Sequence, residues 1–408
     1  MKKGAIKLAM YLNYFVFAIL LNSVGIVILK SQANYGVDEL QASILEAFKD
    51  LPIAIVSFLL ASFLPRIGYK KAMLIGLALV AVACLSMYFG NSFNAAKILF
   101  ATVGVSFALI KVSVYSLIGT VTENQQEHNS LMSSIEGVFM IGIALAYFLF
   151  PAFNSNDNPD SWLNVYWLLA GLTVVSFGFL FFTQFEETKD ITGVNLADDF
   201  AQMVALLAKL LTIVFVISAF LFVMIEQGIM SWLPTFNSKV LHLPENISIM
   251  MASILAISLA AGRILAGIIT KKINWIWVLS FCIVMAMLVV VFVLPKTVGL
   301  QVQEINSLAD IPLIGFAFPL VGLFIAPIYP LLNSVVLSAL PKKLHSAMTG
   351  LIVVFSALGG TLGSRIIGYL FKNEGPENAF YYTLIPMLLL LVSFFILKKL
   401  TAKNEVTA

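Results

Sequence analysis

Twelve apolar segments of membrane-spanning length divide this sequence of 408 residues. A helix needs about 20 mostly apolar residues to cross a bilayer. The segments cover residues 7–29, 41–65, 72–92, 95–121, 129–153, 162–184, 209–236, 246–270, 274–296, 311–340, 345–372 and 377–397. Only 11% of the residues are charged, against about 25% in soluble proteins. The sequence therefore predicts an all-α integral membrane protein and argues against a cytosolic enzyme, a nucleic-acid binder and a secreted disulfide scaffold.

The most polar connection lies between the sixth and seventh segments. It carries the charged residues Glu186, Glu187, Lys189, Asp190, Asp198 and Asp199. We therefore expect an N-terminal six-helix bundle over 1–184, a cytoplasmic linker over 185–208 and a C-terminal six-helix bundle over 209–408. Similar basic turns follow the second segment (Arg66, Lys70, Lys71) and the eighth (Lys271, Lys272). These weak repeats indicate a duplicated six-helix unit, which is how many transporters are built.

The positions of the cations predict the orientation of the chain. With the N-terminus inside, 15 of the 24 Lys and Arg residues fall on the inner side, 5 on the outer side and 4 within spans. Positive charge is concentrated on cytoplasmic loops of membrane proteins. Both termini are therefore expected in the cytoplasm, with the chain in the cell inner (plasma) membrane. The first apolar run is too long for the core of a signal peptide, so we expect it to be a retained span.

Eight charged side chains fall within the predicted spans. A charge at bilayer depth costs at least about 2.5 kcal/mol on insertion scales, so each one requires an explanation. Four are acidic and four are basic, which favours pairing inside the bundle over exposure to lipid. They are Glu46, Asp50, Glu136, Glu226, Lys49, Lys111, Arg263 and Arg365.

Lys111 lies near the middle of the fourth span. Glu46 and Asp50 are four residues apart in the second span and share a helix face, with Lys49 at its edge. One interpretation is an ion pair of Lys111 with Asp50 or Glu46 that substrate or a proton opens. A permanent structural salt bridge is the alternative. Lys111 alone would also attract an anionic substrate.

The remaining charges allow both structural and functional roles. Glu136 fits a gate or direct coupling, and Glu226 fits a substrate or proton site or helix packing. Arg263, on the cytoplasmic side of its span, suits an inner gate or a loop anchor. Arg365, near an outer end, would reach the membrane surface or pair with an acidic residue of an outer gate. The basic turn of Arg66, Lys70 and Lys71 is a further gating candidate.

Uncharged polar residues and aromatic rings also occupy candidate cavity positions. The polar residues are Asn13, Asn22, Ser113, Tyr115, Tyr329 and Asn333. The aromatic residues are Tyr14, Phe48, Phe139, Trp232 and Phe355. Asn22 is the most informative of these, because an amide in the middle of a span needs a partner. The rings either stack on a sugar or serve only in packing.

Several motifs resemble the major facilitator superfamily, and the likeness covers nearly the whole chain. They include Leu64–Lys71 after the second span, although its usual acid is missing here. Glu226–Phe236, Gly262–Gly267 and Ala326–Pro330 are similar to stretches of the fucose/glucose-type sugar:proton symporters. The resemblance implies two pseudo-symmetric six-helix bundles, a sugar substrate and proton coupling. That family places an acidic residue in the fourth span, where this chain has Lys111.

These observations favour a secondary active transporter for a small polar solute. No metal-binding cluster, nucleophile motif or phosphate-binding loop is found, so neither an enzyme nor a cofactor is expected. The expected partners are a small-molecule substrate, a coupling ion (a proton) and the lipid bilayer, with no nucleic acid and no obligate protein partner. Three substrate classes remain open: a neutral monosaccharide, a sugar acid or other organic anion bound by Lys111, and a hydrophobic drug exported from the cell.

Overall fold

The computed structural model describes residues 2–155, 157–184, 196–270, 272–297, 307–341 and 344–405. Eleven helical segments in this part are long and apolar enough to cross a membrane. A further helix, α4, is 24 residues long and takes the place of the predicted second span. The all-α membrane fold is therefore confirmed.

The helices of the first half follow the predicted spans closely. The first span is divided at Ser23, and a short helix precedes the second span. The elements are α1 (Lys2–Asn22), α2 (Val24–Tyr35), α3 (Glu39–Ala42), α4 (Ile44–Ile67), α5 (Tyr69–Gly90), α6 (Phe93–Val121), α7 (Gln125–Ala152), η1 (Ser161–Asn164) and α8 (Val165–Phe182).

The second half contains more interrupted helices. A π-helical turn, η2, breaks the ninth span, and two short 3-10 turns, η4 and η5, form the start of the tenth. The elements are α9 (Leu196–Leu206), α10 (Leu210–Lys239), α11 (Glu245–Ile269), α12 (Trp275–Leu288), η2 (Val289–Val293), α13 (Leu294–Thr297), η3 (Leu308–Asp310), η4 (Leu313–Phe316), η5 (Phe318–Leu320), α14 (Val321–Ile325), α15 (Ile328–Ser338), α16 (His345–Asn373), α17 (Pro376–Ala379), η7 (Phe380–Thr383) and α18 (Leu384–Glu405).

The chain forms two compact units. The first contains residues 1–37 and 48–196, and the second contains 38–47 and 197–408. Residues 38–47, which include α3 and the first turn of α4, thus belong with the C-terminal helices. No sequence pattern assigns this stretch to the second unit.

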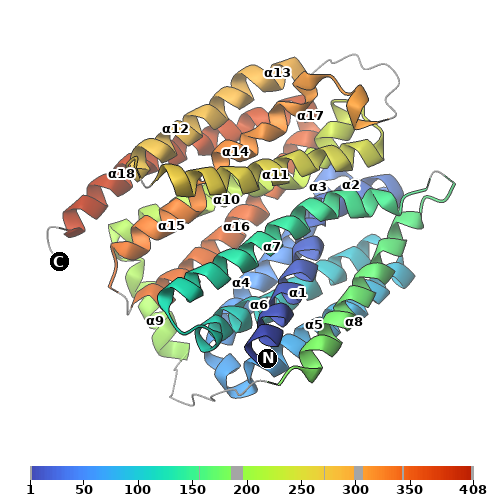
Figure 1. Cartoon of the computed structure of the whole chain (residues 1–408). Coiled ribbons are helices and arrows are strands. Elements are labelled where there is room, and N and C mark those ends of the chain that lie inside the picture. The colour runs from blue at the N-terminus through green and yellow to red at the C-terminus, as the bar shows by residue number, and fades with distance from the viewer. Residues whose placement is uncertain are drawn as a thin grey trace. The chain divides into compact units, whose positions relative to one another are not determined.

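Equivalent helices pair with each other in the two units (Figure 1). In the first, α7 of the fifth span lies against α1, and in the second, α16 of the eleventh span lies against α10 of the seventh. The pairs occupy equivalent places in the two six-span halves. The duplication that the weak sequence repeats indicate is therefore visible in the packing.

Glycines allow equivalent helix pairs to approach closely. A Cβ atom at Gly104 would lie 2.3 Å from the backbone oxygen of Lys49, where α6 meets α4. In the second unit, a Cβ at Gly262 would lie 2.3 Å from the backbone oxygen of Leu323, where α11 meets α14. Small residues provide close van der Waals packing between helices in lipid, where the hydrophobic effect does not drive association.

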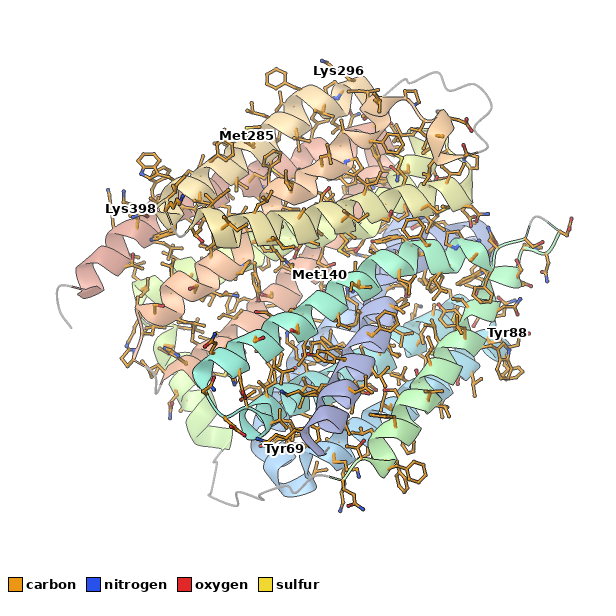
Figure 2. All side chains as sticks on the ribbon, in the orientation of Figure 1. Tyr69, Tyr88, Met140, Met285, Lys296 and Lys398 are labelled. Atoms are coloured by element: carbon orange, nitrogen blue, oxygen red, sulfur yellow. The ribbon has the colours of Figure 1, made fainter. Side chains whose placement is uncertain are left out.

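The basic turn between α4 and α5 consists of a single residue. Gly68 has φ of +91°, a backbone conformation that residues with a side chain rarely adopt. Figure 2 shows Tyr69 and Tyr88 at opposite ends of α5. The 22 residues of α5 span about 33 Å, enough to cross the hydrocarbon layer.

Part of the predicted linker is helical. Residues 185–195, with Glu186, Glu187, Lys189 and Asp190, lie outside the described residues. The following helix, α9, has a buried Met203, and a Cβ at Gly350 of α16 would lie 3.1 Å from its sulfur. Helix α9 therefore packs against the C-terminal helices.

A methyl group at Gly104 should destabilise the first unit. The Cβ of Gly104→Ala would collide with the α4 backbone, and overpacking typically costs about 1–3 kcal/mol. The matched control is Gly171→Ala in α8, where no heavy atom lies within 4 Å of the added Cβ. We expect a lower melting temperature in detergent for Gly104→Ala only. Equal melting temperatures would contradict the close approach.

Candidate functional site

Helix α6 carries a charged and aromatic face in the first unit. Phe107, Lys111 and Tyr115 follow one another at intervals of four residues and so share one side of the helix. The Lys111 Nζ atom lies 5.8 Å from the centre of each of the two rings. Rings at this distance stabilise an ammonium group partly removed from water. Lys111 is half-buried.

A hydrogen bond joins this face to α7. The Tyr115 hydroxyl donates to Glu136 Oε1 at 2.8 Å. No carboxylate among the described residues lies within 4.0 Å of Lys111 Nζ. Tyr115 therefore stands between a cation and an anion, with its ring toward Lys111 and its hydroxyl on Glu136.

Aromatic rings from α1 and α7 complete the cluster. Tyr14 of α1 stacks on Tyr115 with the ring centres 6.3 Å apart, and it meets the edge of Phe139 at 5.8 Å. Phe139 also lies 5.9 Å from Phe107. Tyr14 is 1% exposed, and its hydroxyl has no hydrogen-bond partner among the described residues. We name Tyr14, Phe107, Lys111, Tyr115, Glu136 and Phe139 the Lys111 cluster.

The second unit contains a related polar cluster. Tyr329 of α15 stacks on Phe222 of α10 with the ring centres 5.5 Å apart. Its hydroxyl shares a hydrogen bond of 3.1 Å with the Ser356 hydroxyl of α16. Asn333 lies four residues after Tyr329, and its buried side-chain oxygen has no hydrogen-bond partner among the described residues.

The two clusters repeat one pattern on equivalent helices. In each unit a ring of the first helix stacks on a tyrosine of the fourth, and the tyrosine hydroxyl bonds to the fifth. Glu136 and Ser356, which receive these contacts, both lie eleven residues after the first residue of their helices. Phe107, Phe222 and Ser356 are not among the site residues predicted from the sequence. The four-residue spacing of Phe107 from Lys111, and of Phe222 from Glu226, is the signal that would have identified the two rings.

Glu226 and Arg263 form an ion pair in the second unit. Arg263 Nη2 lies 3.5 Å from Glu226 Oε1, which links α11 to α10. The sequence left Glu226 open to a substrate or proton role or to helix packing, and it suggested an inner gate or a loop anchor for Arg263. It did not predict that the long arginine side chain reaches the glutamate across the helix interface.

The charges of the second span divide between the two units. Lys49 Nζ lies 3.6 Å from Asp50 Oδ1, and both side chains are buried. The anticipated ion pair of Lys111 with Asp50 or Glu46 is not formed among the described residues, since Lys49 already offsets the charge of Asp50. Glu46 is fully buried in the second unit and accepts a hydrogen bond of 2.9 Å from Ser231.

Polar contacts fix α3 to the ends of α10 and α16 within the second unit. Lys372 donates to Asp38 at 2.8 Å, and Lys239 pairs with Glu39. Arg365 donates to the Leu40 carbonyl and to Ser43. Arg365 thus binds a backbone oxygen, where the sequence analysis expected an acidic partner or the membrane surface.

Several other candidate residues form hydrogen bonds within their own helix or to a neighbouring helix. Trp232 is fully buried and donates to Ser364 at 3.0 Å. Asn22 donates to the Ala18 carbonyl of its own helix at 2.8 Å. Lys70 donates to the carbonyls of Phe181 and Thr183, which fastens the end of α8. Lys71 is exposed, and the side chain of Arg66 lies outside the described residues.

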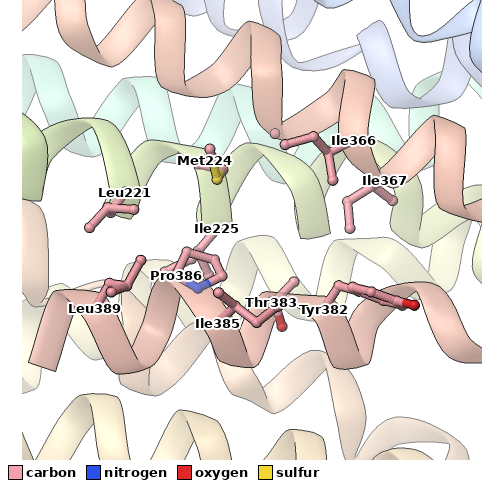
Figure 3. A pocket seen from close by; sticks show the side chains of 11 residues that line it. Leu221, Met224, Ile225, Ile366, Ile367, Tyr382, Thr383, Ile385, Pro386 and Leu389 are labelled. Carbon is pink, nitrogen blue, oxygen red and sulfur yellow. The ribbon is translucent and has the colours of Figure 1, made fainter.

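An apolar crevice lies apart from these polar clusters, between α10, α16 and α18 (Figure 3). Its volume is about 240 Å³. The lining is almost entirely aliphatic and includes Leu221, Met224, Ile366, Pro386 and Leu389. A polar solute would find few hydrogen-bonding groups there, so the crevice is not a candidate site for one.

The comparisons assign the chain to a family. A model of the Major Facilitator Superfamily matches residues 8–363. The chain belongs to this superfamily. It is therefore a multi-pass membrane protein with the fold of a non-enzymatic transporter. A comparison with curated proteins found no match.

Solved structures of transporters share this fold at low sequence identity. A bacterial homologue of the human lysosomal transporter Spinster is 12% identical with a TM-score of 0.75, over 98% of this chain and 97% of that one. A D-xylose–proton symporter is 13% identical with a TM-score of 0.72, over 97% of each chain. The E. coli fucose:proton symporter is 13% identical with a TM-score of 0.64, over 98% of this chain and 99% of that one.

The contact of Asp38 with Lys372 should depend on pH. The hydrogen bond from Lys372 holds the pKa of the Asp38 carboxyl below its ordinary value. The stabilisation that this contact gives the folded protein is complete above about pH 4. It is lost as the pH falls through the lowered pKa of Asp38 in the folded state. Asp38→Asn keeps the helix cap but removes the charge. A double-mutant cycle with Lys372→Gln should give a coupling of about 0.2–1 kcal/mol near neutral pH. A coupling unchanged at about pH 2 would contradict the assignment.

Proposed function

We propose that this chain is a secondary active transporter that moves a small polar solute across the plasma membrane by alternating access, with the Lys111 cluster at its solute site. The observation that most supports this proposal is the half-buried ammonium group of Lys111 among aromatic rings. No carboxylate in the described structure lies within hydrogen-bonding distance of it. Transporters commonly place the substrate site near the bilayer midplane.

The composition of the cluster suits a solute with both polar and apolar faces. Tyr14 and Phe139 provide flat apolar surfaces of the kind that stack on sugar rings. Lys111 and the Tyr14 hydroxyl provide hydrogen-bond donors. A sugar or sugar-like metabolite meets these demands, and two solved structures with this fold are named as sugar–proton symporters.

A coupling proton has a candidate carrier in Glu136. Its side chain is half-buried, it accepts the Tyr115 hydrogen bond, and no basic group among the described residues lies within 4.0 Å of it. Protonation would leave this hydrogen bond possible with the donor reversed. We expect both termini on the cytoplasmic side, as the distribution of cations predicts.

Replacement of Lys111 should remove solute binding without unfolding the protein. A thermal-shift screen of the purified chain against sugars, sugar acids and carboxylates would identify a stabilising solute, because binding to the folded state raises the melting temperature. Lys111→Gln should lose that shift while keeping the melting temperature of the solute-free protein. The matched control is Lys97→Gln on the same helix, whose lysine bonds Asn94.

Two results would count against the assignment. If Lys111→Gln kept the full thermal shift, the lysine would not contact the solute. If Lys97→Gln lost the shift equally, the effect would not be specific to the cluster.

A further inference from the structure

The charges around Lys111 indicate a more specific class of solute than a small polar molecule in general. Tyr115 separates the ammonium of Lys111 from the carboxylate of Glu136, so the two charges offset one another without forming a direct ion pair. A group that approached Lys111 would not first have to break a salt bridge. Breaking a buried ion pair is costly, and this arrangement avoids that cost.

Among the described residues, no charged side chain of a neighbouring helix forms an ion pair with Lys111 or Glu136. Lys49 and Asp50 of α4 are paired with each other. Lys30 of α2 donates to Asn154, and Cys84 of α5 neighbours Tyr166. Of the titratable groups of α1, Lys3 pairs with Glu123, Lys7 and Tyr11 lie nearer its N-terminus, and Tyr14 is stacked on Tyr115. The local charge is therefore set by Lys111 and Glu136.

The buried hydroxyl of Tyr14 is a second observation that indicates a ligand. Buried polar groups in native proteins nearly always have a hydrogen-bond partner. Tyr14 is 1% exposed, and its hydroxyl makes no hydrogen bond of good geometry among the described residues, although it lies near the Tyr115 hydroxyl. A solute oxygen held near Lys111 would provide that partner.

Resting on the proposed function, we infer that the solute is an organic anion and that it crosses the membrane together with a proton on Glu136. The anion takes the Lys111 ammonium as its counter-ion. Its negative charge would leave the cluster one charge negative in a medium of low dielectric constant. A proton on Glu136 restores neutrality, and no covalent bond is formed or broken. One anion and one proton move together, so the cycle carries no net charge.

A neutral solute does not give the same balance. It would leave Lys111 and Glu136 to offset one another, so its binding would not require a proton on Glu136. The aromatic rings favour an anion that also has a ring or an alkyl face. Sugar acids combine a carboxylate with such a face.

The test uses pairs of solutes that differ in one carboxylate. The full chain is reconstituted in liposomes, and uptake of D-glucuronate is compared with D-glucose, and gluconate with glucitol. An internal pH-sensitive dye records proton entry. We expect uptake of the anionic member only, faster with an external pH of about 5.5 than about 7.5, accompanied by internal acidification. A membrane potential imposed with potassium and valinomycin should leave the rate unchanged.

The variants separate the roles of the two charges. Lys111→Gln should lower anion uptake about tenfold or more, which corresponds to about 1.4 kcal/mol of lost binding. Glu136→Gln should abolish the acidification that accompanies uptake, and Glu136→Asp should restore it in part because the carboxyl group is retained. Lys97→Gln is the control for loss of a lysine from α6. Solute-free melting temperatures confirm that each variant is folded.

Four outcomes would overturn the inference. Uptake of the neutral member alone would exclude an anionic substrate but leave the proposed transport function standing. Persistent proton entry in Glu136→Gln would exclude Glu136 as the carrier. Charge movement with each anion would exclude the neutral cycle. If neither member of any pair were taken up, the proposed function would fail together with the inference.

Discussion

The absence of water from the hydrocarbon layer is the constraint on which this structure depends. Each polar group there must find its partner within the protein or in a solute. Lys49 pairs with Asp50, and Arg263 pairs with Glu226. Lys111 differs from both cations, because aromatic rings and a tyrosine-bound carboxylate surround it in place of a direct counter-ion. This difference is the basis on which we propose the Lys111 cluster as the solute site.

Because of the internal duplication, the two units share one arrangement of side chains but differ in the groups that accept the tyrosine hydrogen bond. A ring stacked on a tyrosine, whose hydroxyl bonds to the next helix, occurs in both. In the first unit the acceptor is a carboxylate, and in the second it is the hydroxyl of Ser356. The second unit instead joins its acid and base directly, in the Glu226–Arg263 pair. In Lys111 and Glu136 the first unit therefore has charges that a solute or a proton can still engage, whereas Glu226 and Arg263 of the second are joined to each other.

The sequence was sufficient to predict the fold but only part of the site. Apolar length and cation distribution predicted the spans, because lipid imposes the same requirement on every crossing helix. Lys111, Tyr115 and Glu136 were identified as polar residues within the spans, and the structure brings them together. The partners of the other charges were not predictable. Whether Asp50 pairs with Lys49 or Lys111, and whether Arg263 reaches Glu226, depends on helix rotation and side-chain reach, which apolar periodicity does not determine. The assignment of Asp38–Ala47 to the second unit has no sequence signal either.

The central claim is that an anionic solute binds at Lys111. The most direct measurement is an experimental structure of the full chain with a transported anion at saturating concentration. The account predicts density for the anionic group at hydrogen-bonding distance, about 3 Å, from Lys111 Nζ and near the Tyr14 hydroxyl. Density bound only at Glu226 and Arg263, with the Lys111 cluster unchanged, would contradict it.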